Sequence, residues 1–175
     1  MLPLLTRIDH VGIACRDLDA AIERYEATFG LQVVSLEVNE GQGVREAMLA
    51  VGRAQLAAVA AGDLRPGYVQ LLEPLGPDTP VGRFLARRGE GLHHVGYGVQ
   101  DIGQALDAIG VRGVRLLDER PRHGSMGASI AFLHPADLGG VLTELVQAAG
   151  PALTPCCMPH ERPSGHLGDL PGWIG

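Results

Sequence analysis

The sequence predicts an α+β fold built from two βαβββ modules in tandem. The first observation is an internal repeat, because residues 10–22 (HVGIACRDLDAAI) and residues 94–106 (HVGYGVQDIGQAL) align along their whole length. The identical pairs are His10 and His94, Val11 and Val95, Gly12 and Gly96, Asp17 and Asp101, and Ala21 and Ala105. The second observation is that each copy reads as an alternating segment, then an aspartate, then a helical pattern. The composition allows a buried core, since 46% of the 175 residues are hydrophobic and 19% are charged.

The first module begins with an alternating segment at residues 8–15 (IDHVGIAC), which is typical of a half-buried strand. Asp17 is suited to cap a helix that runs to about Thr28, and Gly30 is suited to stop it. We predict further strands at residues 31–38, 44–51 and 68–73. Residues 54–67 lengthen this module between its third and fourth strands, as a hairpin extension, a short helix or a loop.

The second module repeats this order. It begins with a strand at residues 92–99 and a helix from Asp101 to about Ile109. The further strands are predicted at residues 114–118, 128–133 and 141–147, and a short helix at residues 80–88 connects the modules. We therefore expect a single domain over residues 1–149, with module one at about 7–75, a linker helix within 76–90, module two at about 91–149, and an irregular Pro- and Gly-rich extension at 150–175.

Charge and composition argue against several classes of function. The formal net charge of −6 argues against a general nucleic-acid surface. All 14 basic residues are arginine, which excludes a Schiff-base lysine and a phosphate-loop lysine. No apolar run reaches the length of a membrane span, and the N-terminal residues lack the plan of a signal peptide. Three cysteines form no disulfide framework, so we expect a cytoplasmic protein that binds neither nucleic acid nor membranes.

Four side chains on equivalent strands suggest a metal site. Alternation places His10 in module one, and His94 in module two, on a face otherwise made of very small residues, so we interpret that face as a cleft wall. The last strand of each module adds a polar side chain among aliphatic ones, Gln70 in YVQLLEP and Glu144 in VLTELVQ. Two imidazoles, one amide and one carboxylate suit Co, Mn, Ni, Fe or Zn rather than Ca.

Each of these residues taken alone has a structural alternative, because a single strand histidine is more often a satisfied structural residue than a ligand. The metal prediction therefore depends on four matched positions in a repeat. His93 alternates to the opposite face from His94, where we expect a structural or supporting role. The C-terminal extension contains Cys156, Cys157, His160 and His166. Their spacing matches no standard zinc pattern, so a structural or disordered extension is favoured there.

Five longer stretches carry a resemblance to a known family. They read IDHVGIACRDLDAAIERY (8–25), NEGQGVREAML (39–49), YVQLLEPLGPDTPVGRFL (68–85), GEGLHHVGYGV (89–99) and GSMGASIAFLHPADLGGVLTELVQ (124–147). In these stretches the chain resembles the vicinal oxygen chelate superfamily of glyoxalases, bleomycin resistance proteins and dioxygenases, and within it the methylmalonyl-CoA epimerases most closely. The segment 54–67 and the extension beyond residue 149 depart from the family pattern.

The resemblance implies that the two modules pair into a curved mixed sheet around a metal-binding cleft. It places the metal ligands on His10, Gln70, His94 and Glu144, and the catalytic glutamate on Glu46. The implied reaction interconverts the (2R) and (2S) forms of methylmalonyl-CoA through α-proton abstraction and an enolate stabilised by one divalent ion. Co²⁺ is the expected ion, with Mn²⁺, Ni²⁺ or Zn²⁺ as alternatives. The resemblance also implies an acyl-CoA substrate, a homodimer, and Glu144 as the candidate for a second base.

Alternation supports a catalytic role for Glu46, because this residue shares a strand face with Val44 and Met48 while Arg45 points the other way. The alternative is a surface ion pair between Glu46 and Arg45. The residues that we consider for contact with the CoA phosphates are Arg83, Arg120 and Arg122, although each taken singly is more often a solvated ion. In the RHGSMG loop, His123 and Ser125 either border the substrate or serve the loop alone.

Other functions within the same superfamily stay open from sequence. They are a glyoxalase-like isomerase, a ring-cleaving dioxygenase, an epimerase of a different alkylmalonyl thioester, and a metal-free resistance protein that binds small molecules. An iron site with two histidines and one carboxylate would not need Gln70. Metal-free binding proteins typically lack the ligand set, whereas this chain has all four candidates.

Overall fold

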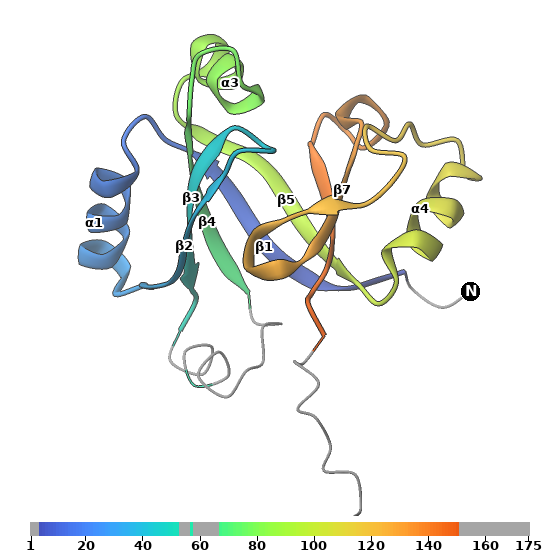
Figure 1. Ribbon diagram of the computed structural model, residues 1–175, viewed down its shortest axis with the longest axis horizontal. Helices are drawn as coiled ribbons and strands as arrows, with labels where there is room; N and C mark the ends of the chain where they lie inside the picture. The colour runs from blue at the N-terminus through green and yellow to red at the C-terminus, as the bar shows by residue number, and fades with distance from the viewer. Residues whose placement is uncertain (1–3, 53–56, 58–66, 151–175) are drawn as a thin grey trace, which may run out of the picture.

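A computed structural model describes residues 4–52, 57 and 67–150 of the chain. It contains an eight-stranded mixed sheet that curls into a half-barrel, which confirms the predicted α+β fold (Figure 1). In chain order the strands are β1 (Leu5–Ala14), β2 (Gln32–Asn39), β3 (Val44–Ala50), β4 (Tyr68–Pro74), β5 (Gly91–Val99), β6 (Arg122–His123), β7 (Ser129–Leu133) and β8 (Thr143–Gln147).

The order of the strands confirms the internal repeat. Across the sheet they run β2-β3-β4-β1-β5-β8-β7-β6, so each module places its first and last strands next to the junction. These two strands are parallel in both modules, β1 with β4 and β5 with β8. The modules join through the antiparallel pair β1 and β5, which brings the four central strands side by side.

The helices begin where the sequence predicts. They are α1 (Leu18–Phe29), α3 (Pro80–Arg88) and α4 (Ile102–Gly110). Asp17 caps α1 by accepting from the backbone N–H of Ala20 at 3.0 Å, and Asp101 caps α4 by accepting from Gln104 at 2.9 Å. Gly30 ends α1 in the left-handed conformation, with φ at 68°.

Each module has its own apolar core between the sheet and one helix. In module one, Leu18 and Ala21 of α1 pack with Leu49 and Leu71 of the sheet. In module two, the corresponding cluster comprises Val99, Ile102, Ala105, Leu106, Ala131, Leu133 and Leu145. Figure 1 shows α1 and α4 at opposite ends of the curved sheet. The helices therefore cover the apolar faces and leave the histidine-bearing face for the cleft, as alternation predicts.

The predicted strand at residues 114–118 is wrong. In this segment Leu116 makes only an isolated bridge, to Leu133, and the strand on the outer side of β7 is instead β6. Backbone hydrogen bonds at 2.9 Å, from Leu117 to Phe132 and from His134 to Arg115, hold the segment at this bridge. Val114 and Leu116 also pack on the core of module two. Arg115 pairs with Asp137 of the short 3₁₀ helix η2 (Pro135–Asp137) at 2.8 Å. These contacts account for the alternation that suggested a strand.

Most of the segment 54–67, and the cysteines and histidines of the extension, lie outside the described residues. Within residues 4–52, 57 and 67–150, no helix has the length and apolar character needed to cross a membrane.

Candidate metal centre

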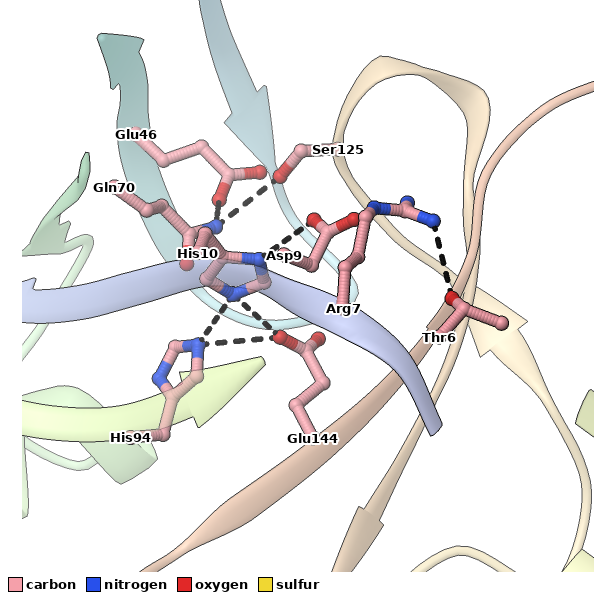
Figure 2. Close-up of polar contacts among 9 residues, drawn as sticks. All are labelled: Thr6, Arg7, Asp9, His10, Glu46, Gln70, His94, Ser125 and Glu144. Atoms are coloured by element: carbon pink, nitrogen blue, oxygen red, sulfur yellow. Dashed lines mark hydrogen bonds and ion pairs between the residues drawn. The ribbon is translucent and has the colours of Figure 1, made fainter. Parts of the chain in front are cut away.

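The four predicted ligands lie on the four central strands. His10 lies on β1, Gln70 on β4, His94 on β5 and Glu144 on β8. All four are buried, with exposed fractions of 3–4%. Figure 2 shows their side chains meeting at the junction of the modules, with both histidine rings directed toward the Glu144 carboxylate. The structure thus brings together residues that are far apart in the sequence.

Three of these side chains place one donor atom each at the corners of a small triangle. The Nε2 atom of His10 lies 2.9 Å from Nε2 of His94 and 2.8 Å from Oε2 of Glu144. The third edge, from His94 Nε2 to Glu144 Oε2, is 3.1 Å. Ligands at right angles around an ion with bonds of about 2.1 Å lie about 3.0 Å apart, so these edges match one face of an octahedral site.

Gln70 is the fourth predicted ligand. Its Nε2 atom donates to Oε2 of Glu46 at 2.5 Å and to Oγ of Ser125 at 3.2 Å. These two bonds fix the orientation of the amide and leave its Oε1 atom buried without a hydrogen-bond partner among the described residues. A buried acceptor without a partner is costly unless a cation binds it. The four donors therefore fit a divalent ion.

The repeated His-x-Gly pattern has a structural reason. His10 pairs across the junction with Gly96, and Gly12 pairs with His94. A Cβ atom on Gly12 would lie 2.2 Å from the His94 ring, and one on Gly96 would lie 2.4 Å from the His10 ring. The space beside each glycine is therefore occupied by the histidine of the other module, so the small residues of this face make room for the two histidine rings.

The charges of the buried groups at this centre shift one another's pKa values. Burial acts to lower the pKa of His10, but the negative charge of Glu144 and the contact with Asp9 outweigh it and raise that pKa to about 9. Burial acts to raise the pKa of Glu144, but the two histidines outweigh it and lower that pKa to about 2. Burial lowers the pKa of His94. The buried Glu144 carboxylate therefore needs a positive charge nearby. A divalent cation between this carboxylate and the histidine nitrogens would supply that charge.

Glu46 lies beside this centre on β3. It is 1% exposed, and its Oε1 atom has no hydrogen-bond partner among the described residues. Burial raises the pKa of Glu46, although hydrogen bonding with Ser125 and Gln70 acts against this rise. Arg45 points the other way, where its guanidinium contacts Asp19 at 2.7 Å. The alternative of a Glu46–Arg45 ion pair is therefore wrong.

Two residues next to the ligand histidines were missed or misplaced by sequence reasoning. Asp9 contacts the Nδ1 atom of His10 at 3.2 Å, and His93 contacts the Nδ1 atom of His94 at 2.9 Å. Strict alternation would place each of these residues on the opposite face of the sheet from the histidine that follows it. The signal that could have found Asp9 is its position beside a ligand histidine in a buried strand, where a carboxylate needs a partner.

A groove leads from the centre to α3. A cavity of about 230 Å³ is lined by His93, His94 and Phe132, among others. It continues into a wider groove of about 450 Å³, which shares both histidines and reaches Arg83 of α3. The wider groove is also lined by Arg87 and Arg88, which the sequence did not single out.

The remaining residues of the predicted substrate path take different places. Arg122 lines the smaller cavity, where it pairs with Asp118 at 2.9 Å. Ser125, in the 3₁₀ helix η1 (Ser125–Gly127), reaches Gln70, whereas Arg120 and His123 are exposed.

Comparison with known proteins gives one family model and several named relatives. The model of the glyoxalase/bleomycin resistance protein/dioxygenase superfamily matches residues 9–132. An ethylmalonyl-CoA/methylmalonyl-CoA epimerase of Cereibacter sphaeroides is 33% identical over 82% of this chain and 99% of its own length. A solved methylmalonyl-CoA epimerase in complex with methylmalonyl-CoA and NH4+ is 52% identical, with a TM-score of 0.76 over 84% of this chain and 97% of that chain. The methylmalonyl-CoA epimerase from Mycobacterium tuberculosis is 40% identical, with a TM-score of 0.75 over 86% of this chain and 94% of that chain.

Proposed function

Because the chain belongs to the glyoxalase/bleomycin resistance protein/dioxygenase superfamily, we propose that it is a metal-dependent epimerase that interconverts (2R)- and (2S)-methylmalonyl-CoA. It is an enzyme of the racemase and epimerase class, as its named relatives are. The observation that carries the proposal is the triangle of donor atoms, with edges of 2.8 to 3.1 Å, beside the buried carboxylate of Glu46.

Glu46 is the proposed base that removes the α proton. Its Oε2 atom is held by the amide of Gln70, while its Oε1 atom is available to accept a proton. A raised pKa makes this carboxylate a stronger base than an exposed glutamate and brings its pKa closer to the operating pH. Because Gln70 contacts Glu46 and is also a proposed ligand, one side chain fixes the distance between the base and the metal position.

His10, Gln70, His94 and Glu144 are the proposed ligands of one divalent cation. When bound there, the cation supplies positive charge to the oxygen on which the enolate charge develops. An octahedral ion held by the two histidines, the carboxylate and Gln70 would keep two positions for a chelating substrate. We propose Co²⁺ as the active ion, with Mn²⁺, Ni²⁺ or Zn²⁺ as alternatives.

Return of the proton to the opposite face of the α carbon requires a second base. Glu144 is the candidate implied by the family resemblance. Its pKa near 2 makes it a weak base, so the structure supports its role as a ligand more than its role as a base. The role of Glu144 as a second base stays a prediction.

The groove beside His94 supports an acyl-CoA substrate. The groove is lined by Arg83, Arg87 and Arg88, and the phosphates of coenzyme A require such charges. One relative is named for both ethylmalonyl-CoA and methylmalonyl-CoA, so a different alkylmalonyl thioester is the second candidate substrate. A homodimer and a cytoplasmic location also stay predictions, which sedimentation and cell fractionation would test.

Isotope exchange tests the proposed function directly. Protein freed of metal with a chelator, and the same protein with Co²⁺ restored, would be incubated with methylmalonyl-CoA in D₂O. We expect deuterium at the α carbon only in the Co²⁺-loaded sample. A parallel assay with a hemithioacetal distinguishes a glyoxalase-like isomerase. Binding without exchange of either substrate would instead support a metal-free binding protein.

A further inference from the structure

The junction of the two modules contains two β-bulges that lie next to the ligand histidines. In the pairing of β1 with β5, Ile8 faces Tyr97 and His10 faces Gly96, so Asp9 is an extra residue on β1. Farther along, Gly12 faces His94 and Ile13 faces Leu92, so His93 is an extra residue on β5. In each module the extra residue therefore comes directly before the ligand histidine. A bulge redirects a side chain that regular alternation would send to the other face.

The bulge at Asp9 allows its side chain to reach the ring of His10. Its Oδ1 atom lies 3.2 Å from Nδ1 of His10, and Asp9 is only 4% exposed. Its second oxygen accepts from the guanidinium of Arg7, which packs across Gly98. The buried carboxylate is thus neutralised on one side and directed at the imidazole on the other. An Asp9 carboxylate has no proton to donate, so the Nδ1 atom of His10 carries the hydrogen and its Nε2 atom faces Glu144.

His93 holds the same position in the second module. Its Nδ1 atom lies 2.9 Å from Nδ1 of His94, and its ring stacks edge-on against Phe84 with centroids 5.0 Å apart. The Nε2 atom of His94 faces His10 and Glu144, which leaves Nδ1 of His94 as the donor. The Nδ1 atom of His93 then accepts, and the Nε2 atom of His93 carries its hydrogen.

We propose that Asp9 and His93 are positioning residues, each of which accepts the Nδ1 hydrogen of the histidine that follows it and so turns the Nε2 atom of that histidine toward a shared metal position. This inference rests on the metal site of the proposed function. Hydrogen bonds of this kind fix the tautomer and the ring orientation of a ligand histidine, and their loss typically weakens metal binding about 10- to 100-fold. The acceptor for this hydrogen differs between the modules. It is a charged carboxylate in module one and a neutral imidazole in module two.

The test measures Co²⁺ binding by calorimetry in protein freed of metal, without substrate. We expect Asp9→Ala and His93→Ala to raise the Kd for Co²⁺ about 10- to 100-fold. Asp9→Asn and His93→Asn keep an acceptor oxygen near the same place, so they should restore much of the affinity. Asp107→Asn removes an exposed carboxylate on α4 and serves as the matched control, with an unchanged Kd.

A second readout follows the hydrogen bonds themselves. In protein with ¹⁵N-labelled histidine, we expect two downfield ring N–H signals, one from His10 and one from His94. Asp9→Ala should shift the His10 signal upfield, and His93→Ala should shift the His94 signal. If Asp9→Ala shows no cooperative thermal transition, the near-isosteric Asp9→Leu, which lacks an acceptor oxygen, and the two His93 variants decide the outcome.

The failure of this inference is distinct from that of the proposed function. Wild-type affinity in both alanine variants, with unshifted ring signals, would overturn the positioning roles alone. A wild-type protein that binds none of Co²⁺, Mn²⁺, Ni²⁺ and Zn²⁺ would overturn the metal site and the positioning roles together.

Discussion

The Nε2 atom of His10 lies 2.9 Å from the Nε2 atom of His94, across the junction of the two modules. Each histidine stands opposite a glycine of the other module, and each ring folds over that glycine. The two copies of the His-x-Gly pattern are therefore complementary, because the histidine of one copy needs the glycine of the other. Neither module contains the site alone, which explains why the repeat and the proposed chemistry belong together.

The first prediction concerns the space beside His10. Gly96→Ala adds a Cβ atom that would lie 2.4 Å from the His10 ring, so the ring must move away from His94 and Glu144. Overpacking of this kind costs about 1–3 kcal/mol of folding stability, and the displaced ring should also raise the Kd for Co²⁺. Calorimetric titration measures this change.

Gly110→Ala is the matched control, because a Cβ atom there meets only Leu116 at 3.8 Å. It should leave Co²⁺ binding unchanged and slightly stabilise α4. Equal Kd values for the two alanine variants would contradict the complementarity of the repeat.

The second prediction separates the base from the ligands. Glu46→Gln keeps the shape of the side chain but removes the carboxylate that accepts the α proton. We expect Co²⁺ binding to persist while deuterium exchange at the α carbon falls by roughly 10²- to 10⁴-fold. Glu73→Gln neutralises a carboxylate on the adjacent strand that contacts Arg45, and it should keep full exchange. Wild-type exchange in Glu46→Gln would remove Glu46 from the mechanism.

The third prediction concerns the pH dependence of the exchange rate. A base must be deprotonated, so the rate should fall as the pH falls through the pKa of Glu46, which burial raises above its ordinary value. In the apparent kcat/KM of the Co²⁺-loaded enzyme, this decline should begin at a higher pH than an exposed glutamate would give. A rate that stays constant down to the ordinary pKa of glutamate would contradict the assignment.

The fourth prediction concerns stability. Hydrogen bonds from Arg115 hold the pKa of Asp137 well below its usual range, so the folded state is stabilised while Asp137 is ionised. This stabilisation is present above the unfolded pKa of about 4 and declines as the pH falls toward the lower folded value. Asp137→Asn should therefore lower the melting temperature at pH 7, and the difference from wild type should shrink steadily below about pH 4.

Asp107→Asn provides the comparison, because Asp107 is exposed on α4. Its substitution should leave the melting temperature unchanged, both at pH 7 and below about pH 4. A constant difference between Asp137→Asn and wild type across this pH range would show that the ion pair with Arg115 is not the cause.

The sequence predicted the parts of this structure that depend on local patterns. Alternation and capping located most strands and the helices, because each aspartate cap precedes a strong helical pattern. The four proposed ligand positions, which the structure brings together, followed from comparing the two copies of the repeat. The strand at 114–118 failed because Val114 and Leu116 alternate for core packing without forming a ladder. Apolar alternation alone does not distinguish a paired strand from a segment that only packs on the core.

The contacts that support the site could not be predicted from such local patterns. Asp9 and His93 reach the ligand histidines only because a bulge interrupts alternation, and a bulge depends on how two distant strands pair. The contact between Gln70 and Glu46 likewise depends on the register of β3 against β4. Sequence indicates which residues line a face, whereas long-range pairing decides which of them touch.

Diffraction from crystals grown with Co²⁺ tests the central claim most directly. The anomalous signal at the cobalt edge should give one peak at the junction of β1 and β5, within about 2.0–2.3 Å of His10 Nε2, His94 Nε2, Glu144 Oε2 and Gln70 Oε1. A peak bound by other residues, or no peak in protein that retains its fold, would contradict the account.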